Sequence, residues 1–193
     1  MKLRTFIALE LSEPLKEGIL ALGSSLKGRG VRASWVKRGA MHLTLKFLGD
    51  VEEGALEGLS RAVRRAASGT PPFRFETTEL GAFPSPRRPR VIWLGVEPNE
   101  ALFDLAEAVE RELSELGFPR ERRPFRPHIT IGRIRDPGAS VDISRTLADL
   151  EGLRKTVEVR EVRVMKSTLL PSGAVHEVLE AAPLGEGTAP DRH

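Results

Sequence analysis

Two short segments of the sequence carry the same polar residues at the same spacing. One reads MHLTLKF, in which His42 is followed by Thr44, and the other reads PHITIGR, in which His128 is followed by Thr130. Residues two apart in a β-strand point to the same face, while the residues between them point to the other. Each segment therefore predicts a histidine and a threonine side by side above an apolar floor.

A pair of such segments has the composition of an acid–base site. The pKa of an imidazole is about 6.5, so at neutral pH one histidine can accept a proton while another donates one. An in-line displacement at phosphorus needs both, on opposite sides of the reacting centre, and threonine hydroxyls can donate hydrogen bonds to the non-bridging oxygens. One such histidine alone is more often a hydrogen-bonded core residue. The repetition favours catalysis.

Metal binding is the main competing explanation for paired histidines. No carboxylate accompanies either histidine at ligand spacing, and sites built from histidine alone usually need three, so we expect no metal. The two remaining histidines show no comparable pattern. His176 follows a valine, precedes a glutamate and has no threonine two places on, which indicates a surface or edge position, and His193 belongs to the end of the chain.

Arginines gather in two proline-containing segments, PSPRRPR at 84–90 and PRERRPFRP at 119–127. They are either solvated loops or a phosphate-facing rim. The second segment runs directly into His128, and Arg133 follows five places later. Strict alternation puts Arg133 on the face of the strand opposite to His128. Gly132 permits a bulge or a strand end that would bring the guanidinium to the histidine's face.

Several further side chains near the motifs have two possible roles. By alternation Lys46 shares the face of the first histidine, where it is a weaker candidate for phosphate contact than for solvent exposure. Four aromatic residues can stack on unpaired bases. We expect Phe47 and Trp93, inside strands, to pack in the core, and Phe83 and Phe125, in loops, to be more open.

Composition limits the chemistry and the setting. The 193 residues are 40% hydrophobic and 30% charged, with a net charge of +3, as expected of one globular domain. The absence of cysteine excludes disulfides, thiolate nucleophiles and cysteine-based zinc sites. No signal-peptide pattern opens the sequence, and no apolar run approaches about 18 residues. We therefore expect a cytoplasmic protein without a membrane segment.

Hydrophobic periodicity predicts alternating strands and helices. Strands are expected at 3–10, 31–36, 41–49, 73–80, 90–96, 128–134, 157–170 with a register break near Glu161, and 174–181; helices are expected at 13–26, 53–67, 99–117 and within 142–150. Without a glycine-rich phosphate loop, a doubly wound nucleotide fold is disfavoured. We predict an α+β fold: one bilobal domain at 1–184, with one histidine strand per lobe, and a flexible tail at 185–193.

Taken together, the residues resemble the two-histidine phosphoesterases, specifically the RNA 2′,3′-cyclic phosphodiesterases, which are also called 2′-5′ RNA ligases. The resemblance covers nearly the whole chain through four segments: RTFIALEL, SWVKRGAMHLTLKFLGDV, LGAFPSPRRPRVIWLGV and FRPHITIGR. The chain departs from many members at Ala40 and Met41, where they have asparagine and leucine.

The resemblance implies a pseudo-two-fold fold in which two antiparallel sheets face a central cleft, with helices outside and no metal or other cofactor. It implies hydrolysis of an RNA-terminal 2′,3′-cyclic phosphate to a 2′-phosphate. His42 would be the proton donor to the leaving 3′ oxygen and His128 the proton acceptor that activates water. Thr44 and Thr130 would hold phosphate oxygens, and Arg133 would be a further phosphate contact.

The expected partners are RNA ends or nucleotides that carry a 2′,3′-cyclic phosphate, bound by a monomer. The family's other name implies RNA ligation as the reverse activity, and sequence does not say which direction matters in the cell. A rival hypothesis is a non-catalytic protein that binds RNA ends through the basic rim alone. Two intact histidine motifs argue against it, because binding by itself needs no pair of titrating groups.

Overall fold

Nine strands and four α-helices alternate along the described part of the chain, as the hydrophobic periodicity predicts. A computed structural model describes residues 1–134, 142–171 and 173–185. The strands are β1 (Lys2–Leu9), β2 (Ala33–Trp35), β3 (Leu43–Glu52), β4 (Phe73–Phe83), β5 (Val91–Val96), β6 (His128–Ile134), β7 (Thr156–Val159), β8 (Glu161–Leu170) and β9 (Gly173–Pro183). The helices are α1 (Glu13–Gly28), α2 (Leu56–Ser68), α3 (Glu100–Ser114) and α4 (Ser144–Ala148), with short 3₁₀ turns at Arg38–Ala40 and Glu53–Ala55.

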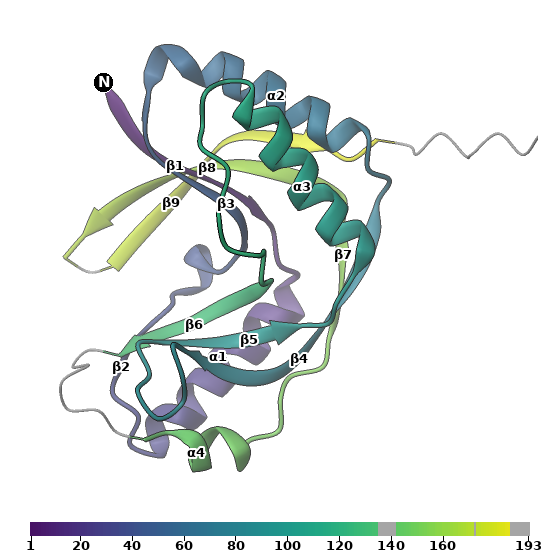
Figure 1. The fold of residues 1–193 in the computed structure, drawn as a ribbon. Helices are drawn as coiled ribbons and strands as arrows, with labels where there is room; N and C mark the ends of the chain where they lie inside the picture. The colour runs from purple at the N-terminus through teal and green to yellow at the C-terminus, as the bar shows by residue number, and fades with distance from the viewer. Residues whose placement is uncertain (135–141, 172, 186–193) are drawn as a thin grey trace, which may run out of the picture.

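All of these strands pair antiparallel in the order β7-β4-β5-β6-β3-β1-β8-β9, with β2 paired to β6. The α+β class is therefore confirmed. In place of the two separate sheets expected from the sequence, the pairing is continuous, because β3 and β6 are joined at Leu43 and Ile129. We call β1, β3, β8 and β9 the His42 half, and β2, β4, β5, β6 and β7 the His128 half (Figure 1).

The sheet is strongly curled, and the chain path explains why. β7 lies at one end of the strand order and β8 and β9 lie at the other, yet only Arg160 separates β7 from β8. The two ends of the sheet must therefore lie near each other, as the path of β7 in Figure 1 shows. The sequence predicted a single strand at 157–170 with a register break. The break is instead the point at which the chain passes from the His128 half to the His42 half.

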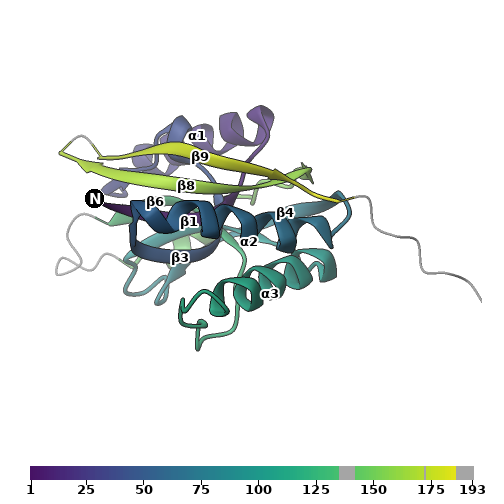
Figure 2. The same cartoon turned by 90° about the horizontal axis from the view of Figure 1, so that it is seen from above.

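Two helices cover mainly the His42 half of the sheet, and two cover the His128 half. Helices α2 and α3 pack on each other; α2 contacts β8 and β9, and α3 contacts β3 and also reaches β4 of the His128 half. Helix α1 contacts β6, and α4 contacts β4 (Figures 1 and 2). Helix α3 begins where the Asn99 side chain accepts a hydrogen bond from the Leu102 amide, at 3.0 Å. Its buried stripe ends at Leu113. Leu116, which lies inside the helix predicted at 99–117, is beyond the end of α3 and is 44% exposed.

β-Bulges follow both histidine motifs at the same place. Between β1 and β3, Ala8 pairs with Thr44 and Ile7 pairs with Lys46, so Leu45 is an extra residue. Between β5 and β6, Trp93 pairs with Thr130 and Ile92 pairs with Gly132, so Ile131 is extra. In each motif the fourth residue is therefore the bulged one, and the alternation of side chains is reversed beyond it.

The first bulge overturns the expectation for Lys46. Because Ile7 and Ala8 point to opposite faces, their partners Lys46 and Thr44 do too. Lys46 is only 5% exposed and donates to Glu110 of α3 at 2.6 Å and to the Pro119 carbonyl at 2.8 Å. It is therefore a structural cation that ties β3 to α3 and to the start of the basic segment 119–127.

The tail predicted at 185–193 falls almost wholly outside the described residues. Only Gly185 lies within them, and its amide donates to the Ala67 carbonyl at 3.1 Å. Among the helices of the described residues, none is long and apolar enough to cross a bilayer.

The Lys46–Glu110 pair generates a stability prediction. Lys46→Met leaves the Glu110 carboxylate, which is only 15% exposed, without its cation, so we expect a loss of about 3 to 5 kcal/mol in the free energy of unfolding. Urea denaturation measures it. Lys46→Met combined with Glu110→Leu removes both charges and should recover most of the loss. A single variant within about 1 kcal/mol of the wild type would show that the pair contributes little.

Candidate active site

The two histidine motifs lie next to each other on one face of the sheet. Leu43 and Ile129 are paired and fully buried, so the residues on either side of them point to the opposite face. Antiparallel pairing then sets His42 opposite Thr130 and Thr44 opposite His128. This places His42 diagonally from His128, a relationship in which Cβ atoms lie about 7 to 8 Å apart.

Both imidazoles are oriented by the same kind of hydrogen bond. Nδ1 of His42 lies 2.8 Å from the carbonyl oxygen of Ala40, and Nδ1 of His128 lies 2.7 Å from that of Arg126. A carbonyl oxygen only accepts, so each Nδ1 carries hydrogen and donates it. In each neutral ring, Nε2 is then the atom that can accept a proton. The two histidines are thus prepared for the same chemistry by matched backbone partners two residues earlier in the chain.

A phenylalanine from the same half of the sheet packs against each catalytic candidate. The ring of Phe6, on β1, lies 4.7 Å from the ring of His42, and the ring of Phe83, on β4, lies 5.0 Å from that of His128, edge to face. Phe6 also packs with Ala8 and Met165 in a small buried apolar cluster that is separate from the main core. Apolar contacts therefore restrain both imidazoles on the site face.

His176 is a site residue that the sequence interpretation missed. It lies on the edge strand β9, as expected, but its ring is 5.0 Å from that of His42 and 4.9 Å from that of Phe6. Its Nδ1 is buried and has no hydrogen-bond partner among the described residues. No local motif marks His176, because the contact arises only when the β8–β9 hairpin pairs beside β1.

The environment of His42 favours its neutral form. Burial, followed by the charge of the neighbouring His176, lowers the pKa of His42 from 6.5 to about 4, and Arg133 and His128 add smaller effects of the same sign. The hydrogen bond to Ala40 opposes this shift but does not reverse it. Burial also lowers the pKa of His176. In the free protein at neutral pH, His42 is therefore an uncharged imidazole with an available Nε2.

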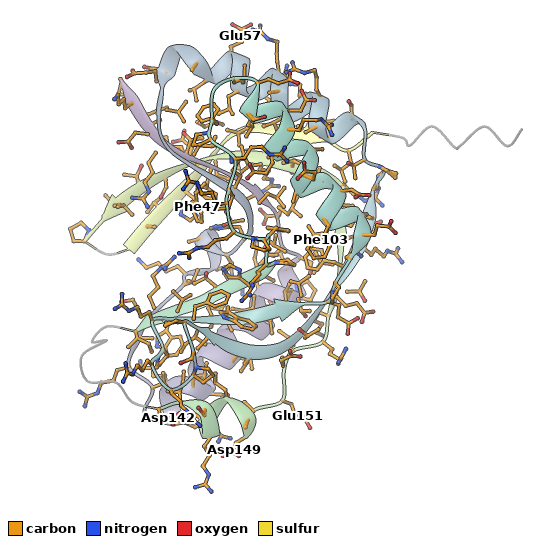
Figure 3. The ribbon with its side chains drawn as sticks, viewed as in Figure 1. Phe47, Glu57, Phe103, Asp142, Asp149 and Glu151 are labelled. Atoms are coloured by element: carbon orange, nitrogen blue, oxygen red, sulfur yellow. The ribbon has the colours of Figure 1, made fainter. Side chains whose placement is uncertain are left out.

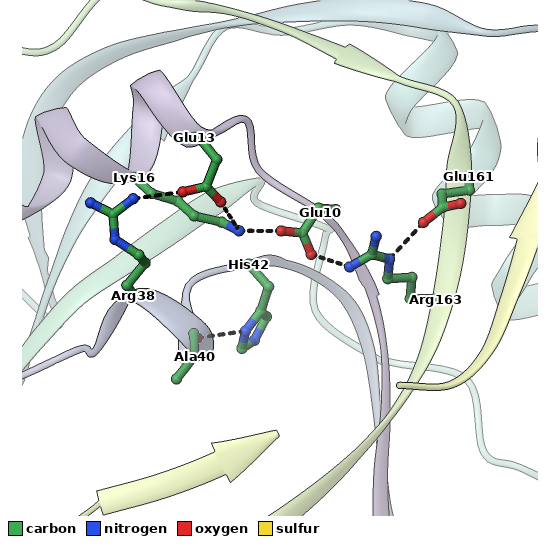
Figure 4. Close-up of polar contacts among 8 residues, drawn as sticks. All are labelled: Glu10, Glu13, Lys16, Arg38, Ala40, His42, Glu161 and Arg163. Atoms are coloured by element: carbon green, nitrogen blue, oxygen red, sulfur yellow. Dashed lines mark hydrogen bonds and ion pairs between the residues drawn. The ribbon is translucent and has the colours of Figure 1, made fainter. Parts of the chain in front are cut away.

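Carboxylates near His42 are already neutralised by cations. Figure 4 shows Glu10 between Lys16 and Arg163, and the chain of ion pairs continues to Glu13 and Glu161. Lys16 lies 2.9 Å from Glu13, and Arg163 lies 2.6 Å from Glu161. Glu10, Lys16 and Arg163 line a small pocket together with His42 and His176. The network joins the residue that follows β1 to α1 and β8, and each of its three carboxylates has a cation partner.

The second bulge, at Ile131 next to Gly132, places Arg133 on the site face, as the glycine permits. Thr130 pairs with Trp93 and Arg133 pairs with Val91, and those two residues of β5 are two apart. Thr130 and Arg133 therefore point to the same side. The Arg133 side chain is exposed and close enough to affect the pKa of His42.

The aromatic residues differ from expectation in two cases, because neither Phe47 nor Trp93 packs in the core. Phe47, predicted to be in the core, is 66% exposed and pairs with Phe6 on the site face, with ring centroids 5.9 Å apart. Figure 3 shows Phe47 beside the strands of the His42 half. Trp93 is partly buried but also on the site face, and Phe83 and Phe125 are partly buried. The bulge after Thr44 accounts for the change at Phe47.

Metal-ligating groups do not gather around the histidines. In the three described ranges, no three side chains of histidine, aspartate or glutamate converge as a metal site would require. What the arrangement offers is two imidazoles, two threonine hydroxyls and one guanidinium around a single surface, a set suited to an anion such as a phosphate group.

Comparison with known proteins agrees with this geometry. A model of the 2′-5′ RNA ligase superfamily matches residues 24–169. An RNA 2′,3′-cyclic phosphodiesterase from Methanothermobacter thermautotrophicus is 34% identical over 181 residues, which cover 93% of this chain and 98% of that protein. Another from Thermotoga maritima is 37% identical over 177 residues, covering 92% and 93%. A crystal structure of a protein from Thermus thermophilus superposes with a TM-score of 0.79 at 30% identity, covering 96% of this chain and 100% of that one.

The fold and the site first define a class: α+β proteins in which a curled antiparallel sheet presents two matched His-x-Thr segments on one face. The family model and the near full-length relatives then show that the chain belongs to the 2′-5′ RNA ligase superfamily. The resemblance drawn from four short sequence segments is thereby confirmed.

The packing of His42 generates a prediction for its titration. NMR of the imidazole protons should give a His42 pKa well below 6.5, and His176→Phe should raise it, because the second titrating ring is removed while an aromatic ring still covers Phe6. Burial persists, so the pKa stays below 6.5. Glu177→Gln, on the same strand and paired with Lys166, is the control and should leave the His42 pKa unchanged. An ordinary pKa in the wild type would contradict this account of the site.

Proposed function

We propose that this protein hydrolyses the 2′,3′-cyclic phosphate at an RNA end to a 2′-phosphomonoester by acid–base catalysis that needs no metal. The observation that carries the proposal is the matched pair of imidazoles, each held through Nδ1 by a backbone carbonyl, on one face of adjoining strands. The activity by which the relatives from Methanothermobacter and Thermotoga are named supports the choice of substrate.

In the proposed reaction, His128 accepts a proton from water as the water oxygen attacks phosphorus. The bond from phosphorus to the 3′ oxygen breaks, and His42 donates a proton to that leaving oxygen, so the phosphate remains on the 2′ oxygen. Attack and departure occur on opposite sides of phosphorus, which fits the diagonal placement of the two rings. A positioned acid or base typically contributes a factor of about 100 to 10,000 in rate.

His42 must gain a proton before it can act as the donor. Its pKa is lowered to about 4 in the free protein, mainly by burial. An opposite charge nearby favours the imidazolium, so a bound cyclic phosphate anion raises the pKa of His42. Substrate binding and proton uptake are therefore coupled in the proposed mechanism, and the buried imidazole becomes charged only when an anion is present to stabilise it.

Thr44, Thr130 and Arg133 are proposed to hold the non-bridging oxygens. The threonine hydroxyls flank the phosphate position through the crosswise pairing, and Arg133 adds a cation on the same face. These groups stabilise the charge that grows on the oxygens in the transition state. The exposed arginines of segments 84–90 and 119–127 are proposed as a rim that attracts longer RNA.

The bilobal, pseudo-two-fold organisation of residues 1–184, with one motif from each half, is part of the proposal. It is supported by the matching bulge after each threonine and by the matching carbonyl partner of each histidine. A monomer satisfies it, because both motifs come from one chain. The rival, an RNA-end binder without catalysis, predicts no turnover above background and RNA binding that does not depend on the two histidines.

The histidine pair generates the central prediction. With a nucleoside 2′,3′-cyclic phosphate and excess chelator, His42→Ala and His128→Ala should each lower turnover by about 100-fold to 10,000-fold, while binding changes much less. The double variant should be only slightly worse than the worse single one, because the two groups act as a unit. Product analysis by chromatography checks both rate and the 2′-phosphate product.

The assignment of roles has its own control. A substrate analogue with a much better 3′ leaving group, such as a 3′-thio derivative, needs no proton donor and should rescue His42→Ala but not His128→Ala. Rescue of His128→Ala instead would exchange the roles. Wild-type activity lost in chelator and restored by zinc or manganese would refute metal independence. Near wild-type turnover in both single variants would remove the histidines from catalysis, and a wild type without turnover above background would leave only the RNA-binding hypothesis.

Arg133 generates a separate prediction. Arg133→Ala removes a charge-assisted contact. We expect it to lower transition-state stabilisation by about 1.5 to 3 kcal/mol, measured from kcat/KM for a mononucleotide cyclic phosphate. Arg87→Ala, in the rim, is the matched control: it should affect mainly longer RNA at low salt, where screening is weak. Equal kinetics of Arg133→Ala and the wild type on the mononucleotide would remove Arg133 from the site.

A further inference from the structure

Three rings form a closed cluster on the His42 side of the site. The ring of Phe6 lies 4.7 Å from that of His42 and 4.9 Å from that of His176, and the two imidazoles are 5.0 Å apart with their planes at 66°. Among the described residues, His128 has no second imidazole beside it, and its ring packs against Phe83 instead. The paired imidazoles are therefore a feature of only one of the two motifs.

His176 borders solvent as well as His42. It lies on β9, the last strand of the pairing order, and the residue is only partly buried. Its Nδ1, however, is buried and has no hydrogen-bond partner among the described residues. Both imidazoles line the same small pocket, in which a water molecule would find polar groups on several sides. This is a suitable position for a group that carries protons from the edge of the sheet to the site.

His42 needs such a group because of the moment at which it gains its proton. Because its pKa is lowered to about 4, the free imidazole is neutral and becomes charged only after the phosphate anion binds. At that stage of the proposed mechanism the substrate lies over the ring, which Phe6 also covers. Nδ1 of His42 already donates to the Ala40 carbonyl, at 2.8 Å. The proton must therefore reach Nε2 from the side, through the pocket that His176 lines.

Other charged groups line the pocket or affect the charge of His42, but they are less suited to this role. They are Glu10, which follows β1, Lys16 of α1, Arg163 of β8, and His128 and Arg133 of β6. Lys16 and Arg163 both donate to Glu10 and are held in ion pairs. A guanidinium does not lose its proton in proteins, which excludes Arg133 as well. His128 has the opposite role, because it accepts a proton from water.

We infer from this arrangement that His176 relays protons to His42 during turnover. It takes a proton from solvent at the edge of the sheet and passes one from Nδ1 to Nε2 of His42, directly or through a water molecule in the shared pocket. It is a positioning residue, because it acts through His42 and not on the reacting atoms. The inference rests on the proposed function and on the role of His42 as the proton donor.

The protons balance over one cycle. His176 gains one proton at Nε2 from solvent and loses one from Nδ1 to His42, so its charge is restored. His42 passes that proton to the leaving 3′ oxygen, while His128 takes one from the attacking water and releases it to solvent after the product leaves. Water entering the open site then exchanges the protons on His176 and restores its starting tautomer.

The test compares His176→Phe with the wild-type full-length protein in dilute buffer at mildly alkaline pH, where protons are scarce. The kcat for a nucleoside 2′,3′-cyclic phosphate should fall about tenfold, less than in His42→Ala, because water still delivers protons slowly. If His176 acted only through its charge, its removal would favour protonated His42 and leave kcat unchanged or higher. Glu177→Gln, on the same strand and in an ion pair with Lys166, is the matched control and should leave kcat unchanged.

Two further measurements separate proton delivery from a structural role. A 3′-thio analogue needs no proton donor, so His176→Phe should hydrolyse it at the wild-type rate. In His176→Ala, free imidazole added to the solution should restore kcat for the cyclic phosphate. Pyrrole, a ring of the same size that exchanges no proton near neutral pH, should not restore it.

The contrary results separate the relay from the proposed function. A kcat of His176→Phe at or above that of the wild type, an equal loss with the 3′-thio analogue, or rescue of His176→Ala by pyrrole as well as imidazole overturns the relay and leaves the proposed hydrolysis intact. Wild-type protein that hydrolyses no cyclic phosphate refutes the proposed function itself. If His176→Phe does not fold, as judged by circular dichroism, His176→Gln serves in the same assays.

Discussion

The site depends on one backbone pairing, that of Leu43 with Ile129, where the two halves of the sheet are joined. Both side chains are fully buried, and burial of both on one face forces the polar neighbours of each onto the other. This is how His42 and His128, far apart in the chain, come to share a surface. A shift of the pairing by one residue would turn one motif into the core, so the apolar floor holds the register as well as the fold.

Two local features of each motif, a β-bulge and a backbone hydrogen bond, complete the arrangement of side chains on the site face. A bulge after each threonine reverses the alternation, which brings Arg133 and Phe47 onto the site face and sends Lys46 toward α3. A backbone carbonyl two residues before each histidine holds its Nδ1 and leaves Nε2 for proton exchange. Because the same features occur in both motifs, the site is symmetric in its catalytic groups.

Its electrostatics and its surroundings are not symmetric. His42 is packed against Phe6 and His176, and burial lowers its pKa, while nearby carboxylates are paired with Lys16 and Arg163. His128 lies instead beside Phe83 and Trp93, and arginines follow in the next segment. Two identical imidazoles thus meet different neighbours, which is what an acid and a base need if each is to have its own role.

The sequence by itself determined the α+β class, most strand and helix positions and the two histidine motifs, because these follow from local alternation and spacing, and Gly132 indicated that a bulge was possible next to it, where the structure has one at Ile131. It misplaced Lys46 and Phe47, since a bulge inside β3 is set by pairing with β1, which no local pattern encodes, and it misplaced Trp93, whose face is set by pairing with Thr130. His176 and the split of 157–170 into β7 and β8 were decided only by the tertiary structure. The reason is the curl of the sheet: Arg160 carries the chain from one end of the strand order to the other, and only then can the β8–β9 hairpin bring His176 to His42.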